Sequence, residues 1–405
     1  MKKLLWFCVT LVLLSCSNEK TTPNEGPWRA SLDLGKGLEL PFLFTYNADN
    51  SIIIYNAEEE IEVTDVQLKG DSIIIGHPVF EGVFKGIFTE DSIYGEFIQP
   101  SLDRVVPFTM VQGKADRFRV TEAPSSMISG NWETVFSPNS VEDRYIAKGI
   151  FKQTGNKVIG TFRTTTGDYR YLDGAIENDS LRLSTFDGAH AFLFHALVKD
   201  SIMEGMFYSG NHWKEPFTAK RNDTYELPAA DSLTFLKEGY DHIEFAFPDT
   251  NGNTVSLTDK RFKNKVVIIQ IMGTWCPNCL DETKYYIQYV NNNPSNDLEF
   301  IALAFEYAKT EEKALMAINK LKNALNVPYP ILLAQVGTSS KQKANEKLPM
   351  LSQVLSYPTT IFIDKKGEVR RIHTGFNGPA TGDKYEEFKR EFEDFVSMLL
   401  AENVD

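Results

Sequence analysis

The hydrophobic pattern of the chain changes once along its length. Between residues 26 and 221, short segments alternate apolar and polar residues and are separated by Gly, Asn and Asp, for example at residues 71–75 and 158–162. A repeat of two residues is typical of β-strands that bury one face. From residue 241 onward, apolar runs of buried-strand type alternate with stretches of helical periodicity. The chain is therefore predicted to be multidomain, with an all-β N-terminal part and an α/β C-terminal part.

The β part contains a tandem repeat. The Gly-x-Trp sequence at Trp28 returns 104 residues later at Trp132, and three further pairs of short segments recur at a spacing of 108 or 109 residues. These pairs are residues 71–73 with 179–181, 91–93 with 200–202, and 107–109 with 216–218. We expect two homologous, barrel- or sandwich-like β modules at residues 26–125 and 126–221. The two tryptophans are expected either to fill the cores or to line a ligand cavity.

The C-terminal part is expected to form one mixed sheet flanked by helices. Residues 222–240, which are polar and contain a proline, are interpreted as the linker that leads into it. The predicted elements are a hairpin at residues 243–257, a strand at 265–272, a helix to about residue 290, a strand at 298–305, a helix at 311–325, a hairpin at 359–363 and 369–373, and a helix at 385–400.

The first residues resemble a bacterial lipoprotein signal. Lys2 and Lys3 precede an apolar run at residues 4–14, which is too short to span a bilayer. The run ends in Leu-Leu-Ser-Cys at Cys16, a sequence similar to the lipobox in which the cysteine is acylated. This pattern predicts a cleaved signal peptide and a lipid anchor.

The expected mature protein is therefore bound to a membrane through its N-terminus. Residues 1–15 are the predicted signal peptide, Cys16 carries the lipid, and residues 16–25 form a tether. The protein is expected in the cell envelope or periplasm. Ser17 favours the outer membrane by the enterobacterial convention.

The charge of the chain excludes one class of partner. Its formal net charge is −13, and removal of the signal peptide with its two lysines makes this about −15. Such an acidic body argues against binding to nucleic acid.

Cysteine chemistry is concentrated in one pair. Of the four cysteines, Cys8 leaves with the signal peptide and Cys16 is used by the lipid, so Cys276 and Cys279 remain. A zinc site would need about four ligands, and no second cysteine pair exists. Haem attachment would need a histidine at Leu280. The pair is therefore predicted to carry out thiol–disulfide chemistry without a cofactor.

The position of the pair assigns a role to each thiol. Cys276 follows a predicted strand and begins a helix, where backbone amides and the helix dipole favour a thiolate. Cys279 lies one helical turn later, shielded but close enough to attack a mixed disulfide. We therefore expect Cys276 to be the nucleophile and Cys279 the resolving thiol, the two forming a redox disulfide.

Several motifs around the pair resemble the ResA/TlpA-like branch of the thioredoxin superfamily. They are Phe-Pro-Asp at residues 247–249, Val-Ser-Leu at 255–257, Lys-Val-Val at 265–267 and Gly-Thr-Trp-Cys-Pro-Asn-Cys at 273–279. The resemblance implies a thioredoxin-like fold for residues 241–405 and reduction of protein disulfides. It also implies a membrane electron donor of the DsbD/CcdA kind.

The resemblance extends to four more site residues. Glu282 matches an acidic residue near the resolving thiol that could move its proton, although a solvated acid complementing the helix dipole is the alternative. Tyr357 and Pro358 match the cis-proline loop, which faces the cysteines and lends backbone groups to an extended substrate. Trp275 corresponds to an active-site aromatic or simply packs there. Gln270 replaces the buried aspartate of thioredoxin itself.

Two hypotheses on function follow. The first is an envelope thiol–disulfide oxidoreductase that reduces protein disulfides through Cys276 and Cys279. The alternative is a surface lipoprotein that binds a ligand or polypeptide through its β modules and carries the redox domain as an accessory.

Overall fold

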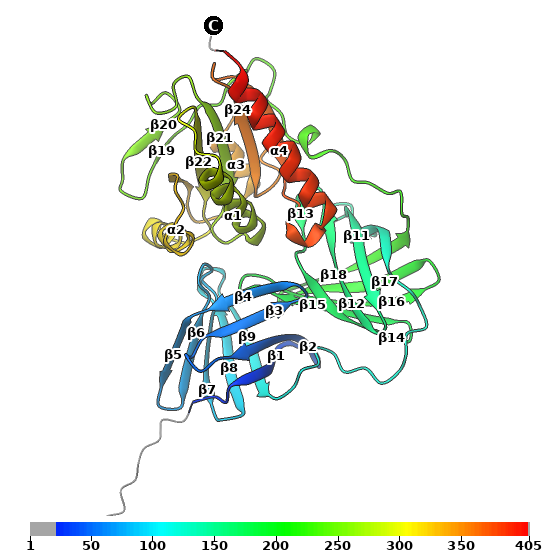
Figure 1. Cartoon of the computed structure of the whole chain (residues 1–405). Helices are drawn as coiled ribbons and strands as arrows, with labels where there is room; N and C mark the ends of the chain where they lie inside the picture. The colour runs from blue at the N-terminus through cyan, green and yellow to red at the C-terminus, as the bar shows by residue number, and fades with distance from the viewer. Residues whose placement is uncertain (1–21, 404–405) are drawn as a thin grey trace, which may run out of the picture.

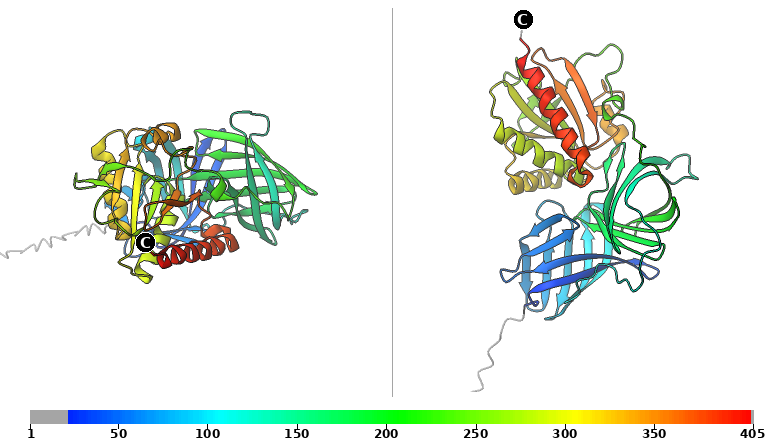
Figure 2. Two further views of the ribbon diagram at one scale, coloured as in Figure 1. Left: turned by 90° about the horizontal axis from the view of Figure 1, so that it is seen from above. Right: turned by 45° about the vertical axis from the view of Figure 1, so that its right-hand side comes forward.

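The computed structural model describes residues 22–403. The predicted signal peptide and the lipid site at Cys16 lie outside these residues. Figure 1 shows a C-terminal body of strands and helices next to two bodies made of strands, and Figure 2 shows the three bodies from two further sides. Ion pairs of Arg170 with Glu59 and Asp281 join all three. The fold class predicted from the sequence is therefore confirmed.

The first β body is a single antiparallel sheet in the order β4-β3-β2-β1-β9-β8-β7-β6-β5. Most neighbours in the sheet are also neighbours in sequence, as expected for hairpins joined by tight turns. Its strands are β1 (Gly26–Gly35), β2 (Leu38–Tyr46), β3 (Ile52–Asn56), β4 (Glu59–Val63), β5 (Asp65–Lys69), β6 (Ser72–Gly76), β7 (Val83–Phe88), β8 (Ser92–Gln99) and β9 (Arg104–Gln112).

The second β body has the order β11-β10-β18-β17-β16-β15-β14-β12-β13, and a further pairing of β11 with β12 closes the sheet into a barrel. Closure removes the unpaired edges that would otherwise invite aggregation. Its strands are β10 (Gly130–Phe136), β11 (Tyr145–Thr154), β12 (Lys157–Thr164), β13 (Gly167–Asp168), β14 (Leu172–Glu177), β15 (Ser180–Phe186), β16 (Ala191–Lys199), β17 (Ile202–Ser209) and β18 (Trp213–Arg221).

The repeat seen in the sequence is also present in the structure. Trp28 on β1 pairs with β9, and Trp132 on β10 pairs with β18, the corresponding last strand. Each indole N–H donates to a carbonyl four residues earlier, at Asn24 (2.8 Å) and Ile128 (2.9 Å). Both tryptophans are fully buried in their cores, which supports the first of the two roles expected for them.

The two β bodies share part of one core. Phe186, at the end of β15, is fully buried and stacks on Phe42 of the first body, with ring centroids 4.5 Å apart. It also contacts Phe97 at 5.2 Å. The first body therefore completes its hydrophobic core with residues of the second.

The C-terminal body is a five-stranded sheet in the order β23-β22-β21-β24-β25 with helices around it. Strand β21 is parallel to β22 and antiparallel to β24, so the sheet is mixed as predicted. The elements are β19 (Ala246–Pro248), β20 (Thr254–Ser256), β21 (Val266–Met272), α1 (Pro277–Asn292), β22 (Leu298–Phe305), α2 (Glu311–Leu325), β23 (Ile331–Gln335), α3 (Lys341–Lys347), β24 (Thr359–Ile363), β25 (Val369–Thr374) and α4 (Asp383–Ala401).

Two of these elements were not predicted from the sequence. Strand β23 is only five residues long and buried on every position, so it shows no alternation. Helix α3 has seven residues and buries only Ala344. Elements this short carry too few periodic positions to be recognised from pattern alone.

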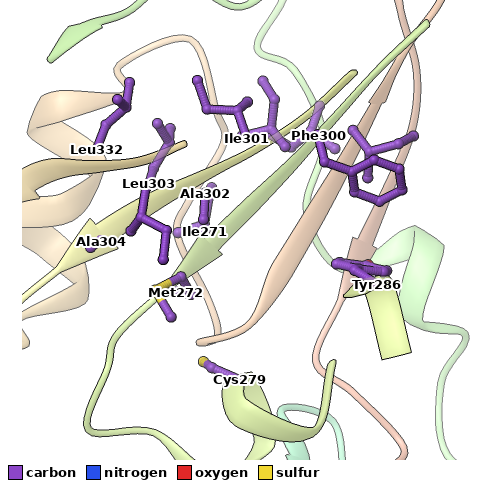
Figure 3. Close-up of a cluster of buried hydrophobic side chains, with 14 of the residues drawn as sticks. Ile271, Met272, Cys279, Tyr286, Phe300, Ile301, Ala302, Leu303, Ala304 and Leu332 are labelled. Atoms are coloured by element: carbon purple, nitrogen blue, oxygen red, sulfur yellow. The ribbon is translucent and has the colours of Figure 1, made fainter. Parts of the chain in front are cut away.

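The central strands β21 and β22 hold the cysteine pair against the core. All seven residues of β21 are buried, and Figure 3 shows Cys279 at the edge of the cluster that includes Ile271, Met272 and Leu303. Within residues 22–403, no helix is both long and apolar enough to cross a membrane.

Candidate active site

The two cysteines stand at the start of α1, as predicted. Cys276 is the N-cap residue, and its sulfur accepts the backbone N–H of Cys279 at 3.3 Å. It also donates to the carbonyl of Tyr357 at 3.4 Å. Both thiols are free; Cys276 is 7% exposed and Cys279 is fully buried. The first sulfur thus faces the backbone N–H groups at the N-terminus of α1.

The second thiol sits in a different environment. Burial raises the pKa of Cys279 well above its ordinary value, and the adjacent Cys276 raises it further. A buried thiol with few charges nearby does not ionise readily. Cys279 therefore needs a proton acceptor before it can attack.

Glu282 lies three positions after Cys279 on α1. Its carboxylate is fully buried and accepts hydrogen bonds from Gln270 Nε2 (2.8 Å) and Thr360 Oγ1 (3.0 Å). Gln270 Nε2 also donates to the carbonyl of Cys279 at 3.3 Å. Burial raises the pKa of Glu282 to about 7, against the lowering effect of its hydrogen bonds. The alternative of a solvated first-turn acid is therefore wrong.

Three aromatic side chains pack together at the residue before Cys276. The indole N–H of Trp275 donates to the carbonyl of Phe305 at 3.0 Å. Its ring meets Tyr357 edge to face at 5.5 Å and tilts against Tyr307 at 5.4 Å. The Tyr357–Pro358 peptide bond is cis, as predicted. The structure thus brings all six predicted site residues of this domain into one region.

Sequence reasoning missed a second buried acid at this site. Glu306 directly follows β22, is buried, and accepts from the backbone N–H and hydroxyl of Thr274 at 2.8 and 2.7 Å. Burial raises the pKa of Glu306 to about 7. Its position after an apolar strand that neighbours β21 was the available signal. Glu306 fixes the turn that carries Trp275 and Cys276.

The second missed feature comes from the second β body. Asn278, between the two cysteines, donates to the carbonyl of Asp168 at 3.1 Å. Arg170 donates to the carbonyl of Pro277 at 3.1 Å and pairs with Asp281. These contacts join residues more than a hundred positions apart, and no local pattern announces them.

Among residues 22–403, no group of three or more histidine, cysteine, aspartate or glutamate side chains is placed to hold an ion.

Comparison with known proteins points to the same part of the chain. Residues 237–387 match the Redoxin family model. The thioredoxin-like protein YneN of Bacillus subtilis is 27% identical over 140 residues, 35% of this chain and 73% of that protein. The thiol-disulfide oxidoreductase ResA of Bacillus subtilis is 26% identical over 140 residues, 35% of this chain and 69% of ResA. A solved thioredoxin-family thiol:disulfide interchange protein from Chlorobium tepidum aligns at 18% identity and a TM-score of 0.31, covering 41% of this chain and 99% of its own.

Proposed function

We propose that the Redoxin domain formed by residues 237–387 reduces protein disulfides through Cys276 and Cys279. The observation that carries this proposal is the arrangement of the pair. Cys276 caps α1 and accepts a helical N–H, while Cys279 lies buried one turn on, beside the carboxyl of Glu282. Cys276 is thus the thiol that attacks the substrate, and Cys279 is the thiol that reacts afterwards with the mixed disulfide.

The reaction has two displacement steps. The Cys276 thiolate attacks a substrate disulfide, forming a mixed disulfide and releasing one substrate thiolate. Glu282 then takes the Cys279 proton, and the Cys279 thiolate attacks Cys276 Sγ. The second substrate thiolate leaves and a Cys276–Cys279 disulfide forms. Two electrons pass from the protein to the substrate.

Three residues are proposed to hold the substrate next to Cys276. Trp275 is partly exposed and offers aromatic surface, and Tyr357, which packs edge to face against it, offers its backbone carbonyl next to Pro358. The carbonyl of Tyr357 already lies 3.4 Å from the nucleophilic sulfur. A substrate chain aligned there would bring its disulfide within reach of Cys276.

The proposed setting is the cell envelope. Acylation at Cys16 would anchor the protein to a membrane, with the outer membrane favoured by Ser17. A DsbD/CcdA-like membrane protein would return the pair to its dithiol form, because an oxidising compartment does not do so. The division of the chain into domains at residues 125, 221 and 240 is part of the same proposal.

The test uses two serine variants of the full chain. Cys276→Ser is expected to abolish reduction of insulin by a thiol-driven assay. Cys279→Ser is expected to accumulate a stable mixed disulfide with the substrate, visible as an added mass that dithiothreitol removes. Full activity in Cys276→Ser would disprove the proposal and leave the β modules as the main functional part.

A further inference from the structure

Residues 164–170, which lead from the end of β12 through β13, lie against the cysteine pair; we call them the covering segment. Asn278 donates to the carbonyl of Asp168 at 3.1 Å. Ser356, two residues before the cis-proline, donates to the carbonyl of Thr166 at 2.6 Å. The segment thus touches both the turn between the cysteines and the cis-proline loop, the two features that face a substrate.

The fit between the covering segment and the loop after β25 is tight. Gly375, at φ +80°, would place a Cβ 2.9 Å from the carbonyl carbon of Thr166. The backbone N–H of Gly378 donates to Asp168 Oδ2 at 2.6 Å. The side chain of Asn278 fills the space that a Cβ on Gly167 would need. No second polypeptide fits between these surfaces while they are in contact.

Arg170 fixes the segment in this position. Its guanidinium pairs with Asp281 of α1, Glu59 of β4 and Asp187 after β15, and all four side chains are largely buried. The arginine therefore ties both β bodies to the cysteine-bearing helix. Charge pairs with this little solvent are costly to separate, so the segment is a fixed part of the folded protein.

A cleft borders Trp275, the residue before Cys276. It has a volume of about 490 Å³ and is lined by Trp275 and Tyr307 of the Redoxin domain and by Val79, Phe80 and Pro100 of the first β body. Its surface is mostly apolar, and it begins at the residue next to Cys276. An apolar side chain near a substrate cysteine could lie in this cleft.

We propose that the covering segment is a specificity-determining wall of the active site. The covering segment blocks access to Cys276 from the side of Asn278, Ser356 and Gly375. Substrates then reach Cys276 only from the side of Trp275. The substrates that fit are small disulfides and flexible, extended polypeptides with apolar residues beside the cysteine. Disulfides on the rigid surface of a folded protein reach the sulfur at least tenfold more slowly than they would without the covering segment. This inference rests on the proposed dithiol chemistry.

The experiment compares two substrates in single-turnover reactions of the reduced full chain. Dithiobis(nitrobenzoate) is the small disulfide and insulin the folded one, and the readout is the ratio of their rate constants. Arg170→Gln, which breaks the three ion pairs, is expected to raise the insulin-to-small ratio at least tenfold. The small-disulfide rate should stay within about twofold, because that reagent already has access.

A second variant covers the case in which Arg170→Gln does not fold. Asp168→Ala removes the acceptor that holds Gly378 and also a buried carboxyl, so it loosens the segment without leaving a charge unpaired. Arg182→Gln is the matched control, since it breaks a partly exposed pair with Glu177 on the same β body. In Arg182→Gln, the ratio of the insulin rate constant to the small-disulfide rate constant should equal that of the wild type.

The outcomes separate this inference from the proposed function. If the ratio is unchanged in every folded variant of the segment, the wall does not exist. If wild-type protein reduces insulin as readily as the loosened variants, the inference is equally wrong. If wild-type Cys276 releases no thiolate from the small disulfide, the dithiol function itself fails and the inference with it.

Discussion

Glu282→Gln is the most direct test of the chemistry at the cysteine pair. The substitution preserves the volume of the side chain and one acceptor for Gln270 or Thr360, but it removes the group that can take a proton. Because burial raises the pKa of Glu282 to about 7, the wild-type carboxyl is close to half ionised at neutral pH. It can therefore both accept and return a proton under working conditions.

Glu282→Gln is expected to slow the step in which Cys279 resolves the mixed disulfide. Cys279 is fully buried and its pKa lies well above the ordinary value, so its thiolate is scarce without a base. General-base assistance contributes about 10²–10⁴-fold, so we expect resolution to slow by about 100-fold in Glu282→Gln. The initial attack by Cys276 should change by less than about twofold, because its sulfur bonds to the backbone of Cys279 and Tyr357 and not to Glu282.

Stopped-flow measurement with dithiobis(nitrobenzoate) separates the steps. The first coloured thiolate appears when Cys276 attacks, and the second appears when Cys279 resolves the mixed disulfide. In the wild type the second phase should accelerate as pH rises through about 7, and in Glu282→Gln this acceleration should be lost.

Glu306→Gln is the matched control for this experiment. Glu306 is also a buried carboxyl with a pKa of about 7, but it bonds to Thr274 rather than lying beside Cys279. Its substitution should leave the second phase within about threefold of wild type. Equal second phases in Glu282→Gln and wild type would refute the role of Glu282 as a base.

Three further predictions concern stability. Arg170→Gln should lower the free energy of unfolding by ~3–5 kcal/mol in urea melts, because it leaves buried carboxylates unpaired, whereas Arg182→Gln should cost below ~1 kcal/mol. Phe186→Ala should cost ~3–5 kcal/mol by opening a cavity in the core shared by the β bodies, and Tyr94→Ala, half exposed, less than ~0.5 kcal/mol. Glu282 has a raised pKa, so its contribution to the free energy of unfolding is complete below pH 4.5 and is lost as pH rises through about 7. The wild-type free energy of unfolding should fall by about 3 kcal/mol over this range because of Glu282, and this fall should be absent when Glu282→Gln is measured against pH.

Elements with long periodic patterns could be predicted from the sequence, and short ones could not. The strand predicted at residues 298–305 and the helix at 311–325 coincide with β22 and α2. The helix has several positions that define its period, and the strand is a mostly apolar run of eight residues, longer than β23. Strand β23 and helix α3 have too few positions to define a period. Strand β23 is held in the sheet by its pairing with β22, and a local sequence pattern does not reveal that pairing.

The cysteine pair and Glu282 could be found because their chemistry depends on local spacing. Cys276, Cys279 and Glu282 follow one another at intervals of three positions. A helix that begins at Cys276 therefore brings Cys279 and Glu282 to the same side. The burial of Glu282 could not be found this way. It depends on Gln270 of β21 and Thr360 of β24, and the strands that carry them meet only in the folded sheet.

Gln270 stands where the resemblance to thioredoxin would place a buried aspartate. Its amide donates to both the carbonyl of Cys279 and the carboxylate of Glu282, and its oxygen accepts from Thr283 at 3.1 Å. An aspartate at this position would face Glu282 as a second buried negative charge, and neither group could then ionise easily. The neutral amide instead holds the single carboxyl of Glu282 in place beside the resolving thiol. The replacement and Glu282 are therefore two parts of one arrangement, and a Gln270→Asp variant should lose proton transfer even though it restores the thioredoxin residue.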